Sequence, residues 1–93
     1  MISVDDVLYF QSDQKYTKVV TVDSEAVIRM SLKELVSRLD GGQFWKVHRS
    51  TIVAASAIHG VKRNELGAWR LSLKDRAERL PVSAEFQKRF KAL

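Results

Sequence analysis

The chain has 93 residues, a length that suits one domain with one hydrophobic core. Hydrophobic residues make up 45% and charged residues 29%, which is typical of a globular protein and argues against disorder. No cysteine is present, which excludes disulfides and thiolate metal sites, and no apolar run is long enough to span a bilayer. We therefore expect a single cytoplasmic domain over residues 1–93, with no membrane partner.

The formal net charge is +5, and the positive charge lies towards the C-terminus. Residues 1–30 contain three Lys or Arg against five acids, whereas residues 61–93 contain nine against four. Such a basic excess indicates nucleic acid or an anionic membrane surface as a partner. On charge alone, nucleic acid is the first hypothesis.

Three strands are predicted in the first third of the chain. β-Branched and aromatic residues favour a strand over Val4 to Gln11, followed by a polar loop over residues 12–15. Residues 16–22 and 25–30 then predict a hairpin. The loop between the first two strands would display four residues that could meet a phosphate backbone, namely Lys15, Tyr16, Thr17 and Lys18.

A short helix is predicted to begin at Leu32. Ser31 opens a capping box, in which its hydroxyl accepts from the Glu34 N–H and the Glu34 carboxylate reaches back to the N–H of the cap. The helix should end at Asp40-Gly41-Gly42, where a positive φ is easy. Packing on a sheet explains its apolar face, so we assign this helix no chemistry.

The stretch from Phe44 to Val53 combines apolar and basic residues without an acid. Its apolar side chains require a core, while Lys46, His48 and Arg49 require solvent or an anion. The segment must therefore run from core to surface, either as a buried strand end with solvated charges or as a binding surface. The hydroxyls that follow, beginning with Ser50, add donors suited to phosphate oxygens and base edges.

Three more strands are predicted over residues 58–63, 68–73 and 78–82. In the second of these, Trp69, Leu71 and Leu73 share one face, while Arg70 and Ser72 share the other. Pro81 lacks an N–H donor and so marks a sheet edge or a strand end.

A last helix is predicted after Ser83, which can cap it. Phe86 and Phe90 begin its buried stripe. Lys88 and Arg89 lie off that stripe, where they either complement the helix C-terminus or bind an anion.

The residues expected of an enzyme are incomplete. A hydrolase needs a nucleophile, a base and an orienting group, and Ser50 with His48 supplies only the first two. His48 and His59 lack the close ligand spacing of zinc sites, and no glycine-rich phosphate loop is present. We predict no enzymatic activity, no cofactor and no metal.

The order of these elements and motifs resembles the LytTR family of bacterial DNA-binding domains over essentially the whole chain. The most specific motifs are Ser31 to Leu35, His48-Arg49-Ser50 followed by Ile52-Val53, and Leu80-Pro81-Val82-Ser83. The resemblance implies a mostly β fold of short antiparallel sheets and hairpins, with one short mid-chain helix and a C-terminal helix. It also implies that loops, instead of a recognition helix, reach into successive major grooves of DNA.

The resemblance and the basic residues together predict a DNA-binding site. Its members are Lys15, Thr17, Lys18, Lys46, His48, Arg49, Ser50, Lys88 and Arg89. Arg49 is the residue expected to read a base, because a guanidinium can bond guanine O6 and N7 together. The alternative is that Arg49 braces a loop or pairs with Asp40.

The chain departs from the family pattern at two positions. Ala84 stands where the family usually has Arg after Val-Ser, which removes an expected base contact, and Ala54 stands where it usually has Asn. The family also usually has one more strand than we find before Val4, as in a trimmed or divergent domain.

The predicted function is sequence-specific binding of double-stranded DNA in transcription regulation. Pairs of protomers would occupy repeated half-sites, and the domain would be the output half of a two-component response regulator with an upstream receiver or sensor domain. Two alternatives are a binder of RNA or single strands, and a protein-interaction domain that has lost specific DNA binding.

Overall fold

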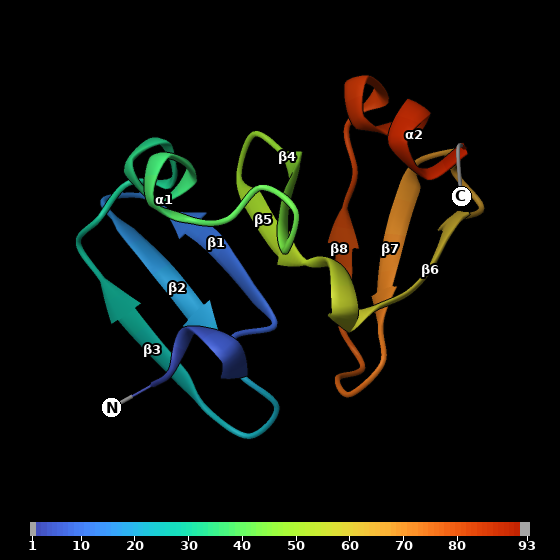
Figure 1. The fold of residues 1–93 in the computed structure, drawn as a ribbon. Helices are drawn as coiled ribbons and strands as arrows, with labels where there is room; N and C mark the ends of the chain where they lie inside the picture. The colour runs from blue at the N-terminus through green and yellow to red at the C-terminus, as the bar shows by residue number, and fades with distance from the viewer. Residues whose placement is uncertain (1, 92–93) are drawn as a thin grey trace.

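The computed structural model describes residues 2–91, with the side chains of the last helix described through Gln87. The fold is mostly β, with two antiparallel sheets and few helices (Figure 1). The first sheet has the order β3-β2-β1-β5-β4, and the second has the order β6-β7-β8. The strands are β1 (Tyr9–Asp13), β2 (Tyr16–Val20), β3 (Glu25–Ile28), β4 (Phe44–His48), β5 (Thr51–Ala54), β6 (Ile58–Arg63), β7 (Trp69–Leu73) and β8 (Arg79–Pro81). The helices are α1 (Leu32–Arg38) and α2 (Ala84–Lys91), with 3-10 turns η1 (Val4–Asp6) and η2 (Ala55–Ala57).

β1 lies in the middle of the first sheet, between β2 and β5. Its first residue, Tyr9, stands opposite Val20 on one side and Val53 on the other, and all three side chains are buried. Apolar side chains at matching register positions explain why these three strands pair, since each contributes to one buried face.

β7 is the central strand of the second sheet, and its alternation confirms the prediction from the sequence. Leu71 and Leu73 are buried, while Arg70 and Ser72 are partly exposed. The turn before β7 contains Gly67 at φ +81°, a conformation that residues with a Cβ rarely adopt.

The two sheets share one hydrophobic core. Val53 from the first sheet, Leu71 from the second and Leu35 from α1 belong to the same buried cluster. The backbone also joins the sheets where the Ser83 N–H donates to the Val47 carbonyl at 2.9 Å. The relative position of the sheets therefore depends on shared burial.

Polar side chains form a second connection, which we call the inter-sheet brace. The Tyr9 hydroxyl donates to Glu78 Oε2 at 2.8 Å, and Arg76 Nε donates to the same oxygen at 2.7 Å. Arg76 also donates to Glu25 Oε2 at 3.1 Å and to the Thr21 carbonyl at 3.0 Å. The brace thus ties the loop between β7 and β8 to the β2–β3 hairpin.

The brace changes the acidity of its members. Burial, together with the hydrogen bond to Glu78 and its charge, raises the pKa of Tyr9 far above its ordinary value. Burial acts to raise the pKa of Glu78, but hydrogen bonds from Tyr9, its own backbone and Arg76 hold it below the ordinary value. The brace therefore contains a neutral phenol and an ionised carboxylate at neutral pH.

The predicted role of Ser31 as the cap of α1 is confirmed, but the Glu34 carboxylate contacts the Ser31 hydroxyl instead of the N–H of the cap. The helix ends just before Asp40, as predicted, whereas the expected positive φ at the glycines is wrong. Ser31 Oγ accepts from the Glu34 N–H at 3.2 Å, and the Ser31 hydroxyl donates to the Glu34 carboxylate at 3.4 Å. Beyond Arg38 the chain turns at Asp40, whose Oδ1 accepts from the Gly42 N–H at 2.8 Å. Because this turn forms with ordinary dihedral angles, Gly41 and Gly42 do not need a positive φ.

The N-terminal strand begins later than the pattern predicts. Val4 to Asp6 form η1, because Ser3 Oγ accepts from the Asp5 N–H and the Val7 N–H donates to the Val4 carbonyl. Only the turn at Gln14 and Lys15 separates β1 from β2, and Gln14 has a φ of +56°.

The prediction for Phe44 to Val53 also needs correction, because these residues form the β4–β5 hairpin and not one continuous segment. Its register shifts between Lys46 and His48, so a bulge precedes the turn at Arg49 and Ser50.

Within residues 2–91, no helix combines the length and the apolar character needed to cross a membrane.

Candidate nucleic-acid interface

The β4–β5 turn holds His48 and Ser50 side by side. His48 Nδ1 lies 2.8 Å from Ser50 Oγ and accepts from the Ser50 N–H at 3.2 Å. Because Nδ1 accepts a backbone proton, the proton of the neutral ring is on Nε2. The turn therefore leaves Nε2–H as the donor that His48 can offer to an anion.

The surroundings of His48 favour its neutral form. Burial lowers the pKa of His48 below its ordinary value, and the charges of Arg49 and Arg70 lower it further. Arg70 belongs to β7, so positive charge from both sheets acts on one ring. A phosphate placed here would be attracted by the charges of Arg49 and Arg70.

Arg49 is exposed at the tip of this turn. Its guanidinium makes no hydrogen bond or ion pair with the described part of the chain, and it is not paired with Asp40. An unpaired guanidinium on a hydrogen-bonded turn is available to a ligand without first breaking an internal contact.

A hollow of about 300 Å³ lies between the β4–β5 hairpin and the start of α2. Its lining is basic on the hairpin side and mixed on the helix side. The lining residues are Lys46, His48, Arg49, Ser83, Glu85 and Phe86. The hydrogen bond from the Ser83 N–H to the Val47 carbonyl fixes α2 beside β4, so hairpin and helix form one surface.

The expected capping role of Ser83 is wrong. Its hydroxyl oxygen is buried and has no hydrogen-bond partner among the described residues, while its carbonyl accepts from the Phe86 N–H at 3.1 Å. The following residue, Ala84, is exposed and carries no donor towards DNA. Lys88 and Arg89 belong to α2, but their side chains lie outside the described residues.

The first hairpin places its predicted site residues in different environments. Lys15 is exposed in the turn between β1 and β2, whereas Thr17 and Lys18 lie within β2. Thr17 is 1% exposed, and its hydroxyl donates to the Met30 carbonyl at 2.6 Å. Lys18 forms an ion pair with Glu25 at 3.8 Å. Of these three residues, Lys15 is the one most accessible to a ligand.

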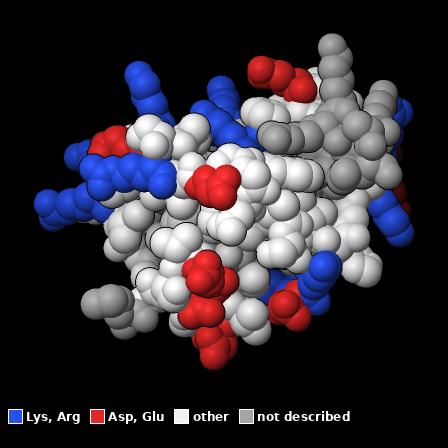
Figure 2. All heavy atoms as spheres, viewed as in Figure 1, with Lys and Arg blue, Asp and Glu red and all other residues white. Residues whose placement is uncertain are grey.

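Positive and negative side chains are unevenly distributed on the surface. In the view of Figure 2, many Lys and Arg side chains project from the left and upper edges, while acidic side chains lie at the top, at the left, in the centre and in the lower part. The β4–β5 turn and α2 both lie in the upper part of the same view (Figure 1).

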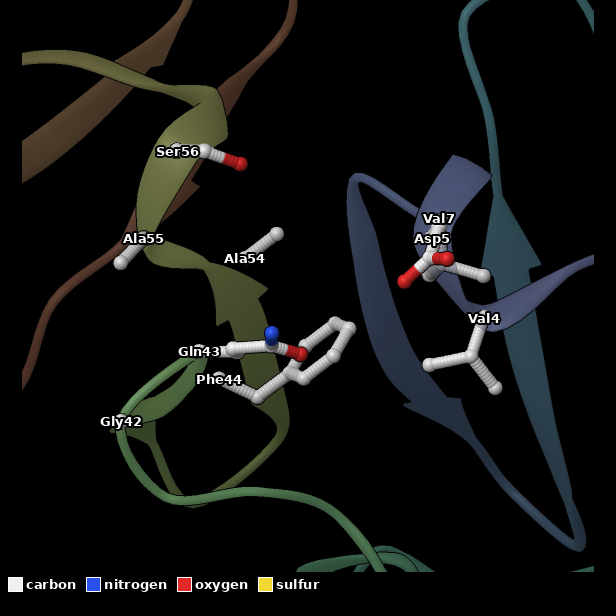
Figure 3. Close-up of a pocket in the computed structure, with 9 residues that line it drawn as sticks. All are labelled: Val4, Asp5, Val7, Gly42, Gln43, Phe44, Ala54, Ala55 and Ser56. Atoms are coloured by element: carbon white, nitrogen blue, oxygen red, sulfur yellow. The ribbon is translucent and has the colours of Figure 1, made fainter.

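A different hollow, of about 340 Å³, lies between η1 and the ends of β4 and β5. Its lining includes the apolar side chains of Val4 and Phe44, and Asp5 is its charged member (Figure 3). No Lys, Arg or His lines this hollow, so it offers no cation to a phosphate and is not part of the interface. Among the described residues, no group of His and acidic side chains is arranged to hold a metal ion.

Comparison with known proteins identifies the fold and its role. The profile of the family described as LytTr DNA-binding domain matches residues 1–93. This chain belongs to the LytTR family. The LytTR domain is also similar to a solved LytTr DNA-binding domain from Bacillus cereus, with a TM-score of 0.84 and 26% identity, over 98% of this chain and 83% of that one.

Curated relatives of the LytTR domain are regulatory proteins. A response regulatory protein of Vibrio cholerae is 38% identical over 98% of this chain, which spans 36% of that protein. The transcriptional regulatory protein YpdB of Escherichia coli is 30% identical over 97% of this chain, which spans 37% of that protein. The predicted family, fold class and role in DNA binding for transcription regulation are thus confirmed. The chain spans about a third of the length of these relatives.

The sequence alone did not show two features of the LytTR domain's interface. It did not show that Arg70, on a separate sheet, lies close enough to influence His48, since 22 positions separate them. It also did not show that Thr17 is buried, because that burial depends on packing and on the bond from its hydroxyl to the Met30 carbonyl. In both cases the missing information is tertiary.

Proposed function

We propose that this LytTR domain recognises a specific sequence of double-stranded DNA through the β4–β5 turn, with Arg49 reading a base in the major groove. The observation that carries this proposal is the exposed, unpaired guanidinium of Arg49 on a turn fixed by the His48–Ser50 contacts. A fixed turn lowers the entropy cost of presenting the guanidinium to guanine O6 and N7.

The surrounding residues would position the domain on the DNA backbone. Lys46 and His48 lie beside Arg49 in the same hollow and can contact phosphate oxygens. Lys15 would contact a phosphate at the first hairpin, with Lys18 less available because of Glu25. Ser50 supports the turn through its contact with His48, and Lys88 and Arg89 of α2 are further candidates for phosphate contacts. Thr17 is left out of this interface, because its hydroxyl is buried and bonded to Met30.

The test begins with selection of bound sequences from random duplex DNA, followed by affinity measurements on the selected and an unrelated duplex. Arg49→Ala should lower the ratio of specific to non-specific affinity by about 5- to 150-fold, which corresponds to roughly 1 to 3 kcal/mol for a bidentate base contact. Lys15→Ala is the control, since losing a phosphate contact should weaken both affinities about equally.

Melting temperatures separate recognition from folding. Arg49→Ala should melt close to the wild type, because Arg49 makes no ion pair in the described structure. If the affinity ratio of Arg49→Ala equals that of the wild type, another residue reads the base. A lowered melting temperature with an unchanged ratio would instead give Arg49 a structural role.

We further propose that two protomers bind repeated half-sites about one helical turn apart. One small domain covers a short site, and pairing adds specificity. The regulatory relatives, of which this chain spans 36% and 37%, support a role as the cytoplasmic output part of a longer two-component regulator with a receiver or sensor region. An enriched direct repeat in the selection would support the pairing, and a single isolated site would contradict it.

The alternatives have less support. Single-strand binders stack bases on exposed aromatic rings. Among the described aromatic side chains, Tyr16 is the exposed one, at 44%, while Trp45 and Trp69 pack against the core. A non-enzymatic interaction domain without specific DNA binding is the remaining alternative, and the selection experiment distinguishes it.

A further inference from the structure

The outer face of the second sheet carries a second basic hollow, distinct from the hollow beside the β4–β5 turn. The hollow measures about 470 Å³. All three strands and the turn between β6 and β7 contribute to it, and its charged lining residues are all basic. These are Lys62, Arg63, Arg70 and Arg79, with His59 beside them.

The strand register explains how these cations come together. Lys62 stands directly opposite Arg70, and Arg79 stands opposite Ser72, two positions further along β7. Directly opposed residues share a face of the sheet, so these side chains form a single cationic surface. Gly60, opposite Ser72, has no side chain, which leaves the floor of the hollow open.

Internal contacts do not neutralise this surface. The ion pairs of the described residues involve only Lys18, Arg76 and their acidic partners, so Lys62, Arg70 and Arg79 have none. Arg63 instead lies over the Trp69 ring, 5.2 Å from its centroid. Like charges opposite one another destabilise a sheet, so an external anion would relieve their repulsion.

The surface is continuous with the candidate interface. Arg70 pairs with Pro81, at the end of the strand that leads into α2, and the Val82 N–H donates to the Trp69 carbonyl at 3.4 Å. The charge of Arg70 also lowers the pKa of His48. Positive charge therefore extends from the β4–β5 turn across β7 to Lys62 and Arg79.

We propose that this outer face, made by Lys62, Arg70 and Arg79, is a second phosphate-binding surface that contacts the DNA backbone flanking the recognised site. This inference rests on the proposed recognition of DNA by the β4–β5 turn. The side chains come from strands, and they surround an open hollow without an acid in its lining. Such a surface suits the repeated charges of a backbone and carries no sequence information. Flanking DNA would add affinity without adding specificity.

The experiment compares a short duplex, limited to the selected site, with the same site extended by about ten base pairs on each side, one helical turn. The variant is Lys62→Gln with Arg79→Gln, which removes two exposed cations and leaves Arg70 beside His48. Lys74→Gln is the control, because Lys74 is exposed in the β7–β8 loop and does not line the hollow.

For the wild type and Lys74→Gln, the extended duplex should bind several-fold more tightly than the short one. The double variant should lose that gain and bind the short duplex like the wild type. On the extended duplex, its slope of log affinity against log salt should be smaller by about 2, since each phosphate contact contributes about 0.9. Unchanged melting temperatures would show that the variants are folded.

Two results would overturn the inference: a wild type that binds both duplexes equally, or a double variant that keeps the full gain. The second result would assign the cations to a different anionic partner, such as an acidic protein. Neither result affects base recognition, because that is measured separately by the specificity ratio of Arg49→Ala on the short duplex.

Discussion

Removing the Tyr9 hydroxyl tests whether the inter-sheet brace stabilises the fold. Tyr9 is 2% exposed, and its hydroxyl donates to Glu78 Oε2 at 2.8 Å, so Tyr9→Phe deletes one bond to a charged acceptor and leaves the ring in place. Such bonds contribute about 1.5 to 3 kcal/mol. The Glu78 side chain is 34% exposed and keeps its bond to Arg76, so water can replace part of the loss. We therefore expect a loss of about 1 to 2 kcal/mol in the free energy of unfolding.

For a domain of this size, that loss corresponds to a fall in Tm of roughly 5 to 15 °C. Thermal and urea unfolding followed by circular dichroism would measure it. Tyr16→Phe is the matched control, because Tyr16 is 44% exposed and its hydroxyl makes no hydrogen bond with the described residues. If both variants melt within about 1 °C of the wild type, the brace does not stabilise the fold and the reasoning fails.

The remaining predictions concern binding and local structure. Lowering the pH from 7.5 to 6 should strengthen DNA binding, because a nearby phosphate raises the depressed pKa of His48 and favours proton uptake; His48→Gln should flatten this dependence in fluorescence titrations. Without DNA, the depressed pKa of His48 means that the unfolded chain takes up a proton more readily than the folded domain. The free energy of unfolding should therefore decrease as the pH falls below about 6.5. Ser31→Ala should cost about 1 kcal/mol in urea unfolding, because the Glu34 N–H loses its cap; a loss below 0.3 kcal/mol would contradict this. Affinity for any duplex should fall steeply between low and physiological salt, and a flat response would exclude phosphate contacts. The free domain should sediment as a monomer at micromolar concentration, and a stable dimer would contradict pairing only on DNA.

Features set by local sequence could be predicted. The cap at Ser31 depends on a residue three positions away, and the alternation of β7 depends on its own side chains. The bulge before His48 could not be predicted, because it depends on the pairing of β4 with β5. The bond between Tyr9 and Glu78 joins residues 69 positions apart, and nothing near either residue indicates the other.

In the candidate site, too, features set by local sequence could be predicted and features set by tertiary packing could not. The basic cluster from Lys46 to Arg49 was visible as a run of residues, and the hairpin brings it together as a turn. The burial of Thr17 and the approach of Arg70 to His48 depend on tertiary packing, so neither could be predicted from the neighbouring residues. Local chemistry thus indicated a basic cluster at this turn, whereas its tertiary surroundings could not be predicted.

The order of strands along the chain has a consequence for synthesis on the ribosome. All strands of the first sheet lie within residues 9–54, so this sheet can pair before the second, within residues 58–81, has been made. Until then its core face lacks Leu71 and Leu80, and the Tyr9 hydroxyl lacks Glu78. We expect the emerging chain to expose apolar surface during this interval, which makes it the stage most open to aggregation or to a chaperone.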